Sequence, residues 1–239
     1  MSEMDDLKVP PELQAMFRSR FLETLQHDPG LDHDEFPLFK WFAKETDALI
    51  DSMLAVETAG IKEQVDAGIE DFNDSGFVAV EYFARRTRYS HVIFLTSVFE
   101  SYLDRACTTL RHVVGKHNMP FTLEELSGDK WTKRRRFLER YGHFQINDSE
   151  WETAEILSTV RNILVHDNGS TSSISEKIMA RLRSLDGLRL DSHEIVVESV
   201  YVRGAASGLR KLIDSIQSEI KKVASLAQRP QGVIGSGTP

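Results

Sequence analysis

The stretch that decides the fold is residues 92–110, VIFLTSVFESYLDRACTTL. Its apolar side chains recur at spacings of three and four residues, as one face of an α-helix requires. The positions on this face are Val92, Leu95, Phe99, Tyr102, Leu103, Ala106 and Leu110. The pattern predicts a long helix over about residues 77–116 whose apolar stripe faces a core, and Asn118-Met119-Pro120 ends it.

Outward from this helix, the same periodicity dominates the chain. It predicts helices over about residues 11–27, 37–72, 130–142, 149–167, 173–184 and 200–227. Ser149 and Glu152 have the spacing of a capping box, so we expect Ser149 to cap its helix. The period changes to two at Leu188 and Leu190, and again at Ile195 and Val197, which predicts a small hairpin. The expected fold is therefore all-α, an up-down helical bundle with a β-hairpin before the last helix.

Charge divides the chain unevenly at Asn73-Asp74-Ser75-Gly76, a turn-forming sequence. Residues 1–74 hold 18 acidic and 6 basic side chains, whereas the remainder carries a net charge of +4. We expect an acidic helical extension over 1–74, a helical domain over 75–227, and a disordered tail over 228–239. In the extension, the predicted second helix has apolar positions at Leu38, Phe42, Leu49, Met53, Val56 and Ile61. The extension either covers basic surface or contributes this helix to the core.

Composition excludes several classes of protein. The chain of 239 residues is 41% hydrophobic and 28% charged, which is ordinary for a soluble globular protein. No apolar run approaches the roughly 20 residues of a membrane span, and the acidic N-terminus does not resemble a secretory signal. A single cysteine, Cys107, excludes an internal disulfide and a cysteine-based zinc site. We therefore expect a cytoplasmic protein with no metal, no cofactor and no membrane partner.

The segment with the most chemical content is residues 160–169, VRNILVHDNG, at the end of a predicted helix. One face of that helix is apolar through Ile156, Leu157, Val160, Ile163 and Leu164, and Trp151, Ala154 and Val165 lie on the opposite side. The helix must therefore be covered twice. Asn162 and His166 are i, i+4 neighbours. Arg161 is about 140° from His166 on an ideal wheel, and its long side chain can reach around the last turn.

Arg161 and Asn162, followed by His166 and a small polar-glycine turn, resemble the signature of the HEPN superfamily. The setting is similar as well, with Phe99-Glu100 in the long upstream helix and a basic segment before the motif helix. The resemblance covers about residues 77–226. Other pairs share the bare Arg–His spacing but lack this context: Arg85 and Arg86 with His91, Arg111 with His117, and Arg136 with His143.

The resemblance implies a HEPN-like bundle and a metal-independent endoribonuclease, of the toxin or phage-defence type, whose active site is composite in a homodimer. Arg161 would bind the scissile phosphate and His166 would be the general acid or base, with Asn162 orienting the substrate or the histidine. Glu100 would hold Arg161. Across the dimer, Trp151, Ala154 and Val165 would pack against the partner. The alternative is that Arg161 pairs with a carboxylate and His166 caps its own helix.

Two basic clusters are candidate RNA-binding surfaces. Lys130, Lys133, Arg134, Arg135 and Arg136 accompany Trp131 on one short helix, a combination that suits phosphate and base-stacking contacts. The alternative for this helix is a solvated amphipathic helix with Trp131, Phe137 and Leu138 inward. The second cluster is Arg85, Arg86, Arg88, Tyr89 and His91, which is either an RNA-entry surface or is neutralised by the acidic extension.

The rival function is a non-catalytic HEPN module that binds a nucleotide or a protein partner, and a third is a structural scaffold. A toxin-type enzyme would also require a neutralising, antitoxin-like protein. Some family members carry a tyrosine two residues after the histidine and are controlled there by a nucleotidyltransferase. This chain has Asn168 at that position, so that form of control is not expected.

Overall fold

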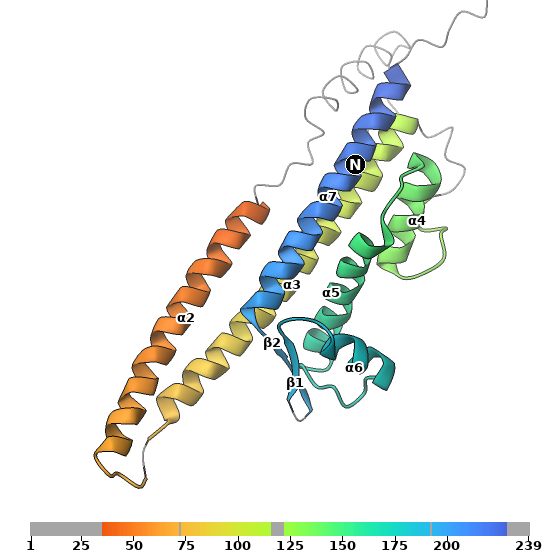
Figure 1. Ribbon diagram of the computed structural model, residues 1–239. Helices are drawn as coiled ribbons and strands as arrows, with labels where there is room; N and C mark the ends of the chain where they lie inside the picture. The colour runs from red at the N-terminus through yellow and green to blue at the C-terminus, as the bar shows by residue number, and fades with distance from the viewer. Residues whose placement is uncertain (1–34, 72, 116–121, 192, 229–239) are drawn as a thin grey trace, which may run out of the picture. The chain divides into compact units, whose positions relative to one another are not determined.

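The computed structural model describes residues 35–71, 73–115, 122–191 and 193–228, and these are mostly helical (Figure 1). The helices are α2 (Glu35–Asp66), α3 (Ser75–Val114), α4 (Lys130–Gly142), α5 (Asp148–His166), α6 (Glu176–Arg183) and α7 (Ser199–Gln228). The hairpin consists of β1 (Leu188–Asp191) and β2 (Glu194–Val197). The prediction of an all-α chain with a hairpin before the last helix is confirmed for this part of the chain. The helix predicted over 11–27 and the tail lie outside it, apart from Gln228, which ends α7.

The backbone contacts group the chain into two compact units, and α3 and α7 contribute residues to both. The first unit contains residues 102–146 and the part of α7 from Ile213. The second contains residues 33–101 and 147–212. In this grouping, α2 belongs to the same unit as the first part of α3.

In the first unit, α4 lies within a small helical core. Asp129 caps α4 by accepting hydrogen bonds from the backbone N–H groups of Trp131 and Thr132. The Tyr102 hydroxyl donates to the Ile213 carbonyl at 3.2 Å. Trp131, Phe137 and Leu138 are buried, so α4 is amphipathic with its apolar face inward, as the alternative interpretation predicted.

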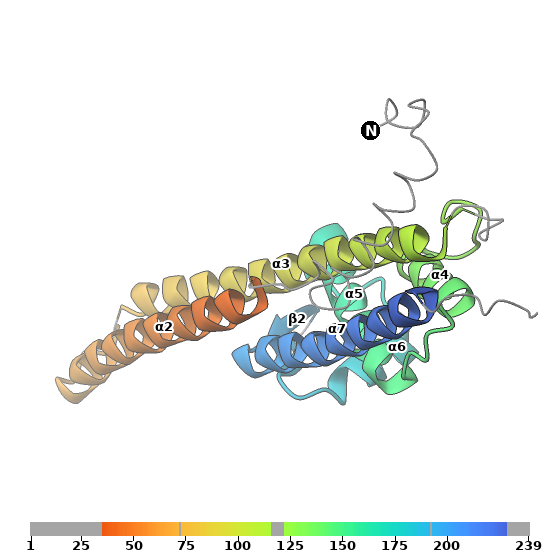
Figure 2. The same cartoon turned by 90° about the horizontal axis from the view of Figure 1, so that it is seen from above.

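In the second unit, α2 and the first part of α3 run side by side and are joined by residues 67–74 (Figures 1 and 2). The Phe39 ring contacts the His91 and Phe94 rings, each with centroids 5.5 Å apart. The buried apolar residues of α2 are Phe36, Phe39, Ala43 and Ile50. Most of the apolar positions noted in the sequence, Leu38, Phe42, Leu49, Met53 and Val56, are exposed. Both sides of α2 carry apolar residues, and α3 covers the side that contains Phe39.

The N-cap of α5 lies two residues before the predicted one. Asn147 is the N-cap and its side chain accepts from the Ser149 N–H, so the prediction that Ser149 caps the helix was wrong. Both residue types are good caps, and the two positions compete for the same helix start. The buried Trp151 of α5 packs against Phe99 of α3, with ring centroids 6.3 Å apart.

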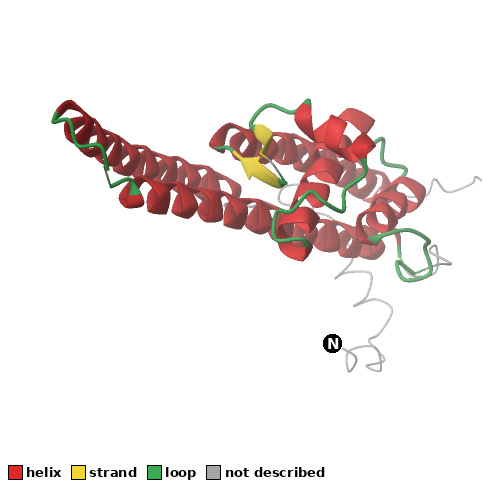
Figure 3. Ribbon diagram, turned by 90° about the horizontal axis from the view of Figure 1, so that it is seen from below, coloured by secondary structure: helices red, strands yellow, loops and turns green. Residues whose placement is uncertain are grey.

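The hairpin pairs antiparallel in the register Leu188↔Val197 and Leu190↔Ile195 (Figure 3). Leu188, Ile195 and Val197 are buried. The Tyr89 hydroxyl of α3 donates to the Ile195 carbonyl, which joins β2 to the long helix. This strand in turn positions the loop that follows α5.

Candidate functional site

The last turn of α5 brings the three motif side chains together. The Arg161 Nη1 atom lies 3.1 Å from Asn162 Oδ1 and 3.4 Å from His166 Nε2. The side chain therefore reaches around the helix as its length predicted. A guanidinium can only donate, so a hydrogen bond in this contact requires Nε2 as the acceptor. A ring nitrogen that can accept a hydrogen bond is the kind of atom that takes a proton in general-base catalysis.

The motif faces solvent. Asn162 and His166 are exposed and Arg161 is half-buried. Among the residues that the structure describes, Arg161 forms no ion pair, and its hydrogen bonds use Nη1 alone. The alternative that Arg161 pairs with a carboxylate is therefore wrong for this part of the chain. The edge formed by Nε and Nη2 has the geometry that binds two phosphate oxygens at once.

A left-handed turn ends the motif helix directly after His166. The Asp167 and Gly169 N–H groups both donate to the Ile163 carbonyl, at 3.2 and 3.0 Å. Asn168 and Gly169 have φ values of 51° and 85°, which glycine and asparagine tolerate best. This is the stop that the sequence predicted at residues 167–169.

Backbone hydrogen bonds then fasten the chain after the turn to β2. The Ile195 N–H donates to the Gly169 carbonyl at 2.8 Å, and the Thr171 N–H donates to the His193 carbonyl at 2.7 Å. Residues 169–171 thus lie along the edge of the hairpin. The end of the motif helix is held by a second element and does not fray freely.

Two side chains of α3 also contact this turn. Arg86 Nη1 donates to Asn168 Oδ1 at 2.9 Å, and its guanidinium lies 5.0 Å from the centre of the Tyr82 ring. A Cβ atom at Gly169 would lie 3.0 Å from the Tyr89 hydroxyl. We call Arg86, Tyr89, Asn168 and Gly169 the turn clamp. Sequence reasoning marked Asn168 and Gly169 as a helix stop but gave no sign of their partners on α3.

The predicted RNA-entry cluster is largely engaged within the chain. Arg85 Nη1 lies 2.5 Å from Glu194 Oε2, and Arg88 Nε lies 3.7 Å from Oδ1 of Asp47 in α2. His91 is only 5% exposed, and burial lowers its pKa although Asp47 opposes that shift. The acidic segment thus neutralises Arg88, as one of the two interpretations predicted. Asp47 also pairs with Arg203 of α7 at 3.1 Å.

Three other predicted site residues are not where the prediction placed them. Glu100 is not a partner of Arg161, whose side-chain hydrogen bonds go to Asn162 and His166. Trp151 is 2% exposed and Ala154 is fully buried, so the chain's own core covers them and no partner subunit can. The second apolar face of α5 is therefore covered from within. Val165 differs, because it is 42% exposed.

The basic side chains of α4 do not form one surface. Arg134 is 4% exposed and pairs with Asp104 at 2.5 Å, so its predicted contact with RNA is wrong. Arg135 pairs with Glu139, and Arg136 donates to the Ser127 carbonyl at 2.7 Å. Of the remaining two, Lys130 is exposed and Lys133 is half-buried. Trp131 is buried and cannot stack on a base.

In the described ranges, no three side chains of His, Cys, Asp or Glu gather closely enough to hold a metal ion. Nor does any helix in those ranges have the length and apolar character of a membrane span. Comparisons of the chain with models of protein families, with curated proteins and with solved structures found no match. What the site can do must therefore be argued from Arg161, Asn162 and His166 themselves.

Proposed function

We propose that this protein is a metal-independent endoribonuclease of the HEPN type. The observation that carries the proposal is the contact at 3.4 Å between Arg161 Nη1 and His166 Nε2 on an exposed helix end. This contact supports the proposal because arginine commonly binds phosphate oxygens and histidine commonly serves as a general acid or base. Arg161, Asn162 and His166 are the catalytic residues in this proposal.

The reaction uses the RNA's own 2′-hydroxyl as nucleophile. The 2′-hydroxyl takes the place of Arg161 Nη1 at His166 Nε2, which then accepts the hydroxyl proton while O2′ forms a bond to phosphorus and the bond from phosphorus to O5′ breaks. Arg161 binds the non-bridging oxygens through Nε and Nη2 as negative charge grows there. An acid protonates O5′. The products are a 2′,3′-cyclic phosphate and a 5′-hydroxyl, and atoms and charges balance without a metal ion.

A second copy of the chain would supply the acid. Proton transfer is needed at both O2′ and O5′, and one motif offers one histidine. Two motifs facing each other across a homodimer would offer two. Because Trp151 and Ala154 are buried, the seam in this proposal runs through the exposed Val165 beside the motif. Val165→Glu should then weaken the dimer in sedimentation, whereas Val56→Glu, exposed on α2, should not.

The decisive experiment is cleavage of a labelled RNA by the purified full chain in EDTA. His166→Ala should lose about 10²–10⁴-fold in rate, as removal of a general acid–base group does. The matched control is His143→Asn, an exposed histidine outside the motif with a φ of 54° that asparagine also tolerates. Wild-type activity that vanishes in EDTA, or that survives in His166→Ala, would show the assignment to be wrong.

An endoribonuclease with an exposed site threatens the RNA of its own cell. We therefore place it among toxins or phage-defence effectors that a neutralising protein restrains. Expression of the wild-type chain should arrest growth, and expression of His166→Ala should not. The rival function, a non-catalytic module that binds a nucleotide or protein, predicts equal growth with both and RNA that is never cleaved.

A further inference from the structure

One face of α2 is left in water by the part of the chain that the structure describes. It consists of Leu38, Phe42, Leu49, Met53 and Val56, which lie within about 60° of one another on an ideal helical wheel. We call these five residues the α2 stripe. All of them are exposed, Leu38 by 62% and Val56 by 68%. Contiguous apolar surface of this kind marks a place where another structural element binds.

The stripe borders an apolar groove between α2 and α3. The groove has a volume of about 450 Å³ and is lined by Leu38, Phe39, Phe42, Ser90, His91 and Phe94. Phe94 stacks on Phe39 but is still 46% exposed, so covering this ring would remove more apolar surface from water. A helix that lies along the stripe can place a side chain in this groove.

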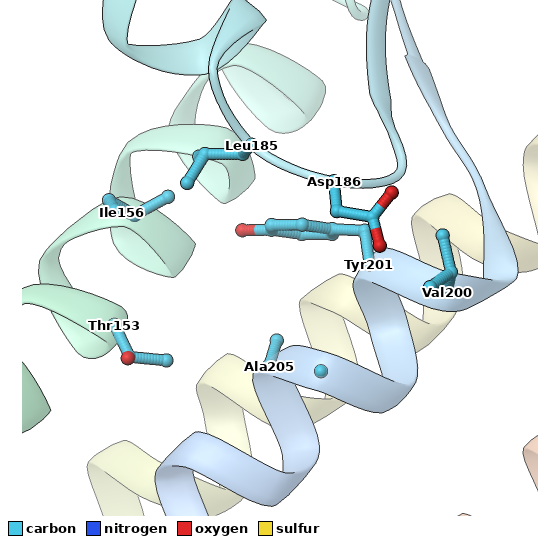
Figure 4. A pocket seen from close by; sticks show the side chains of 8 residues that line it. Thr153, Ile156, Leu185, Asp186, Val200, Tyr201 and Ala205 are labelled. Atoms are coloured by element: carbon cyan, nitrogen blue, oxygen red, sulfur yellow. The ribbon is translucent and has the colours of Figure 1, made fainter.

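The depression between α5 and α7 that Figure 4 shows offers much less apolar surface. It has a volume of about 270 Å³, and its lining residues Ile156, Tyr201 and Ala205 are already buried. Filling it would remove little further apolar area from water. On the α2 stripe, by contrast, more than half of Phe42 and of Leu49 is exposed. The stripe is therefore the surface that gains most when it is covered.

The chain carries a segment whose pattern suits this surface. Residues 1–34 directly precede α2 and lie outside the described part of the chain, and the sequence predicts a helix over 11–27. Every fourth residue of that helix is apolar: Leu13, Phe17, Phe21 and Leu25. An isolated helix of about 17 residues is marginal in water, so it needs a surface on which to bury such a face.

The length of the segment and its connection to α2 match the stripe. At 1.5 Å per residue, a helix over 11–27 is about 26 Å long, and the distance along α2 from Leu38 to Val56 is about 27 Å. Residues 28–34 span up to about 25 Å, whereas the axes of packed helices are about 8–10 Å apart. Asp28-Pro29-Gly30 is a turn-forming sequence. The segment can therefore fold back antiparallel onto the helix that follows it.

The charges beside the stripe complement those of the segment. On the ideal wheel, the exposed Glu45 lies about 20° from the edge of the α2 stripe, whereas Lys40 and Lys44 lie about 120° or more from it. In the segment, Arg18 and Arg20 lie on either side of the apolar face. Opposite charges that flank an apolar seam favour pairing of two helices and fix their alignment.

We propose that residues 11–27 form a helix that docks antiparallel on the α2 stripe and covers the groove between α2 and α3. In this arrangement Phe21 lies over the groove near Phe42, and Leu13 lies beside Leu49. The occupant belongs to the same chain, so a protein partner or a second copy has to displace it before binding here. No residue of the proposed ribonuclease motif takes part, so this inference is independent of that function.

Amide hydrogen exchange of the full chain, followed by mass spectrometry over residues 11–27, measures this docking. The segment should exchange about tenfold faster or more in Leu49→Glu than in the wild type, because the change puts a charge on the stripe. The matched control is Val65→Glu, an exposed position about 160° from Leu49 on the same helix, and it should exchange as the wild type does. Within the segment, Phe17→Glu should lose the protection and Ala15→Glu, about 160° from Phe17, should keep it.

An engineered disulfide shows which chain supplies the helix. Leu13→Cys combined with Leu49→Cys should form a disulfide within one chain, whereas Leu13→Cys combined with Val65→Cys should not. The native Cys107 is buried and does not compete. The proposal is overturned if residues 11–27 exchange as fast in the wild type as in Leu49→Glu, if Val65→Glu loses protection equally, or if the disulfide joins two chains.

Discussion

Replacing Arg134 with alanine should destabilise the protein far more than the same change at Arg136, two residues along α4. Arg134 is buried, and its Nε and Nη2 atoms lie 2.7 and 2.5 Å from Asp104 Oδ1. Its Nη1 atom donates to the Lys130 carbonyl at 2.8 Å. Arg136 is exposed and donates to Ser127. The two arginines therefore differ in burial but belong to one helix.

The size of the effect follows from what is lost. The two buried stem methylenes of Arg134 that alanine lacks contribute about 0.8 kcal/mol each. A charge-assisted hydrogen bond contributes about 1.5–3 kcal/mol. The Asp104 side chain is 51% exposed, so water replaces much of the ion pair and we count one such bond. Arg134→Ala should then cost about 4 kcal/mol, Arg134→Met about 2 kcal/mol because the stem remains, and Arg136→Ala under about 1 kcal/mol.

Urea unfolding followed by far-ultraviolet circular dichroism measures these differences. A second readout is RNA affinity, which folded Arg134→Met should leave unchanged because Arg134 cannot reach a phosphate. Equal unfolding midpoints for Arg134→Ala and Arg136→Ala would refute the buried-pair reasoning. Loss of RNA affinity in folded Arg134→Met would restore Arg134 to the RNA-binding surface.

Three further predictions concern Gly208, Cys107 and His91. Gly208→Ala should cost about 1–3 kcal/mol, because its Cβ atom would lie 2.7 Å from Thr153 Cγ2; an unchanged melting temperature would contradict this. Burial raises the pKa of Cys107 to about 12, so iodoacetamide at about pH 8 should label this thiol only after unfolding, and rapid native labelling would disprove it. Burial lowers the pKa of His91 below the value of about 6.5 in the unfolded chain. The unfolded state then binds more protons in acid, so stability present above about pH 6.5 is lost as the pH falls; His91→Leu should lose less.

The helices could be predicted from sequence because their period is local information. The prediction for residues 130–142 coincides with α4, and the alternating residues around Asp191 formed the hairpin. The buried side of α2 could not be predicted in this way. Leu38 and Phe39 are neighbours and both apolar, and only the position of α3 decides that Phe39 is buried.

The candidate site likewise has one part that local sequence predicts and one part that depends on distant residues. Arg161, Asn162 and His166 lie within six residues on one helix, so their proximity was predictable. Trp151 was misassigned because a second apolar face looks the same whether a subunit or the chain's own helix covers it. The turn clamp depends on residues far apart in sequence, such as Arg86 and Asn168, which no periodicity connects.

The turn clamp also has a consequence for how the chain can change by descent. Few residues other than glycine, asparagine and aspartate accept the backbone of positions 168 and 169 without strain, and Arg86 needs a side-chain oxygen at position 168. If Arg86 is replaced, a side-chain oxygen at position 168 no longer has a donor to accept from. If Asn168 is replaced, an arginine at position 86 loses this acceptor. In descendants of this sequence, the two positions should change together although they are 82 positions apart, while 169 stays glycine.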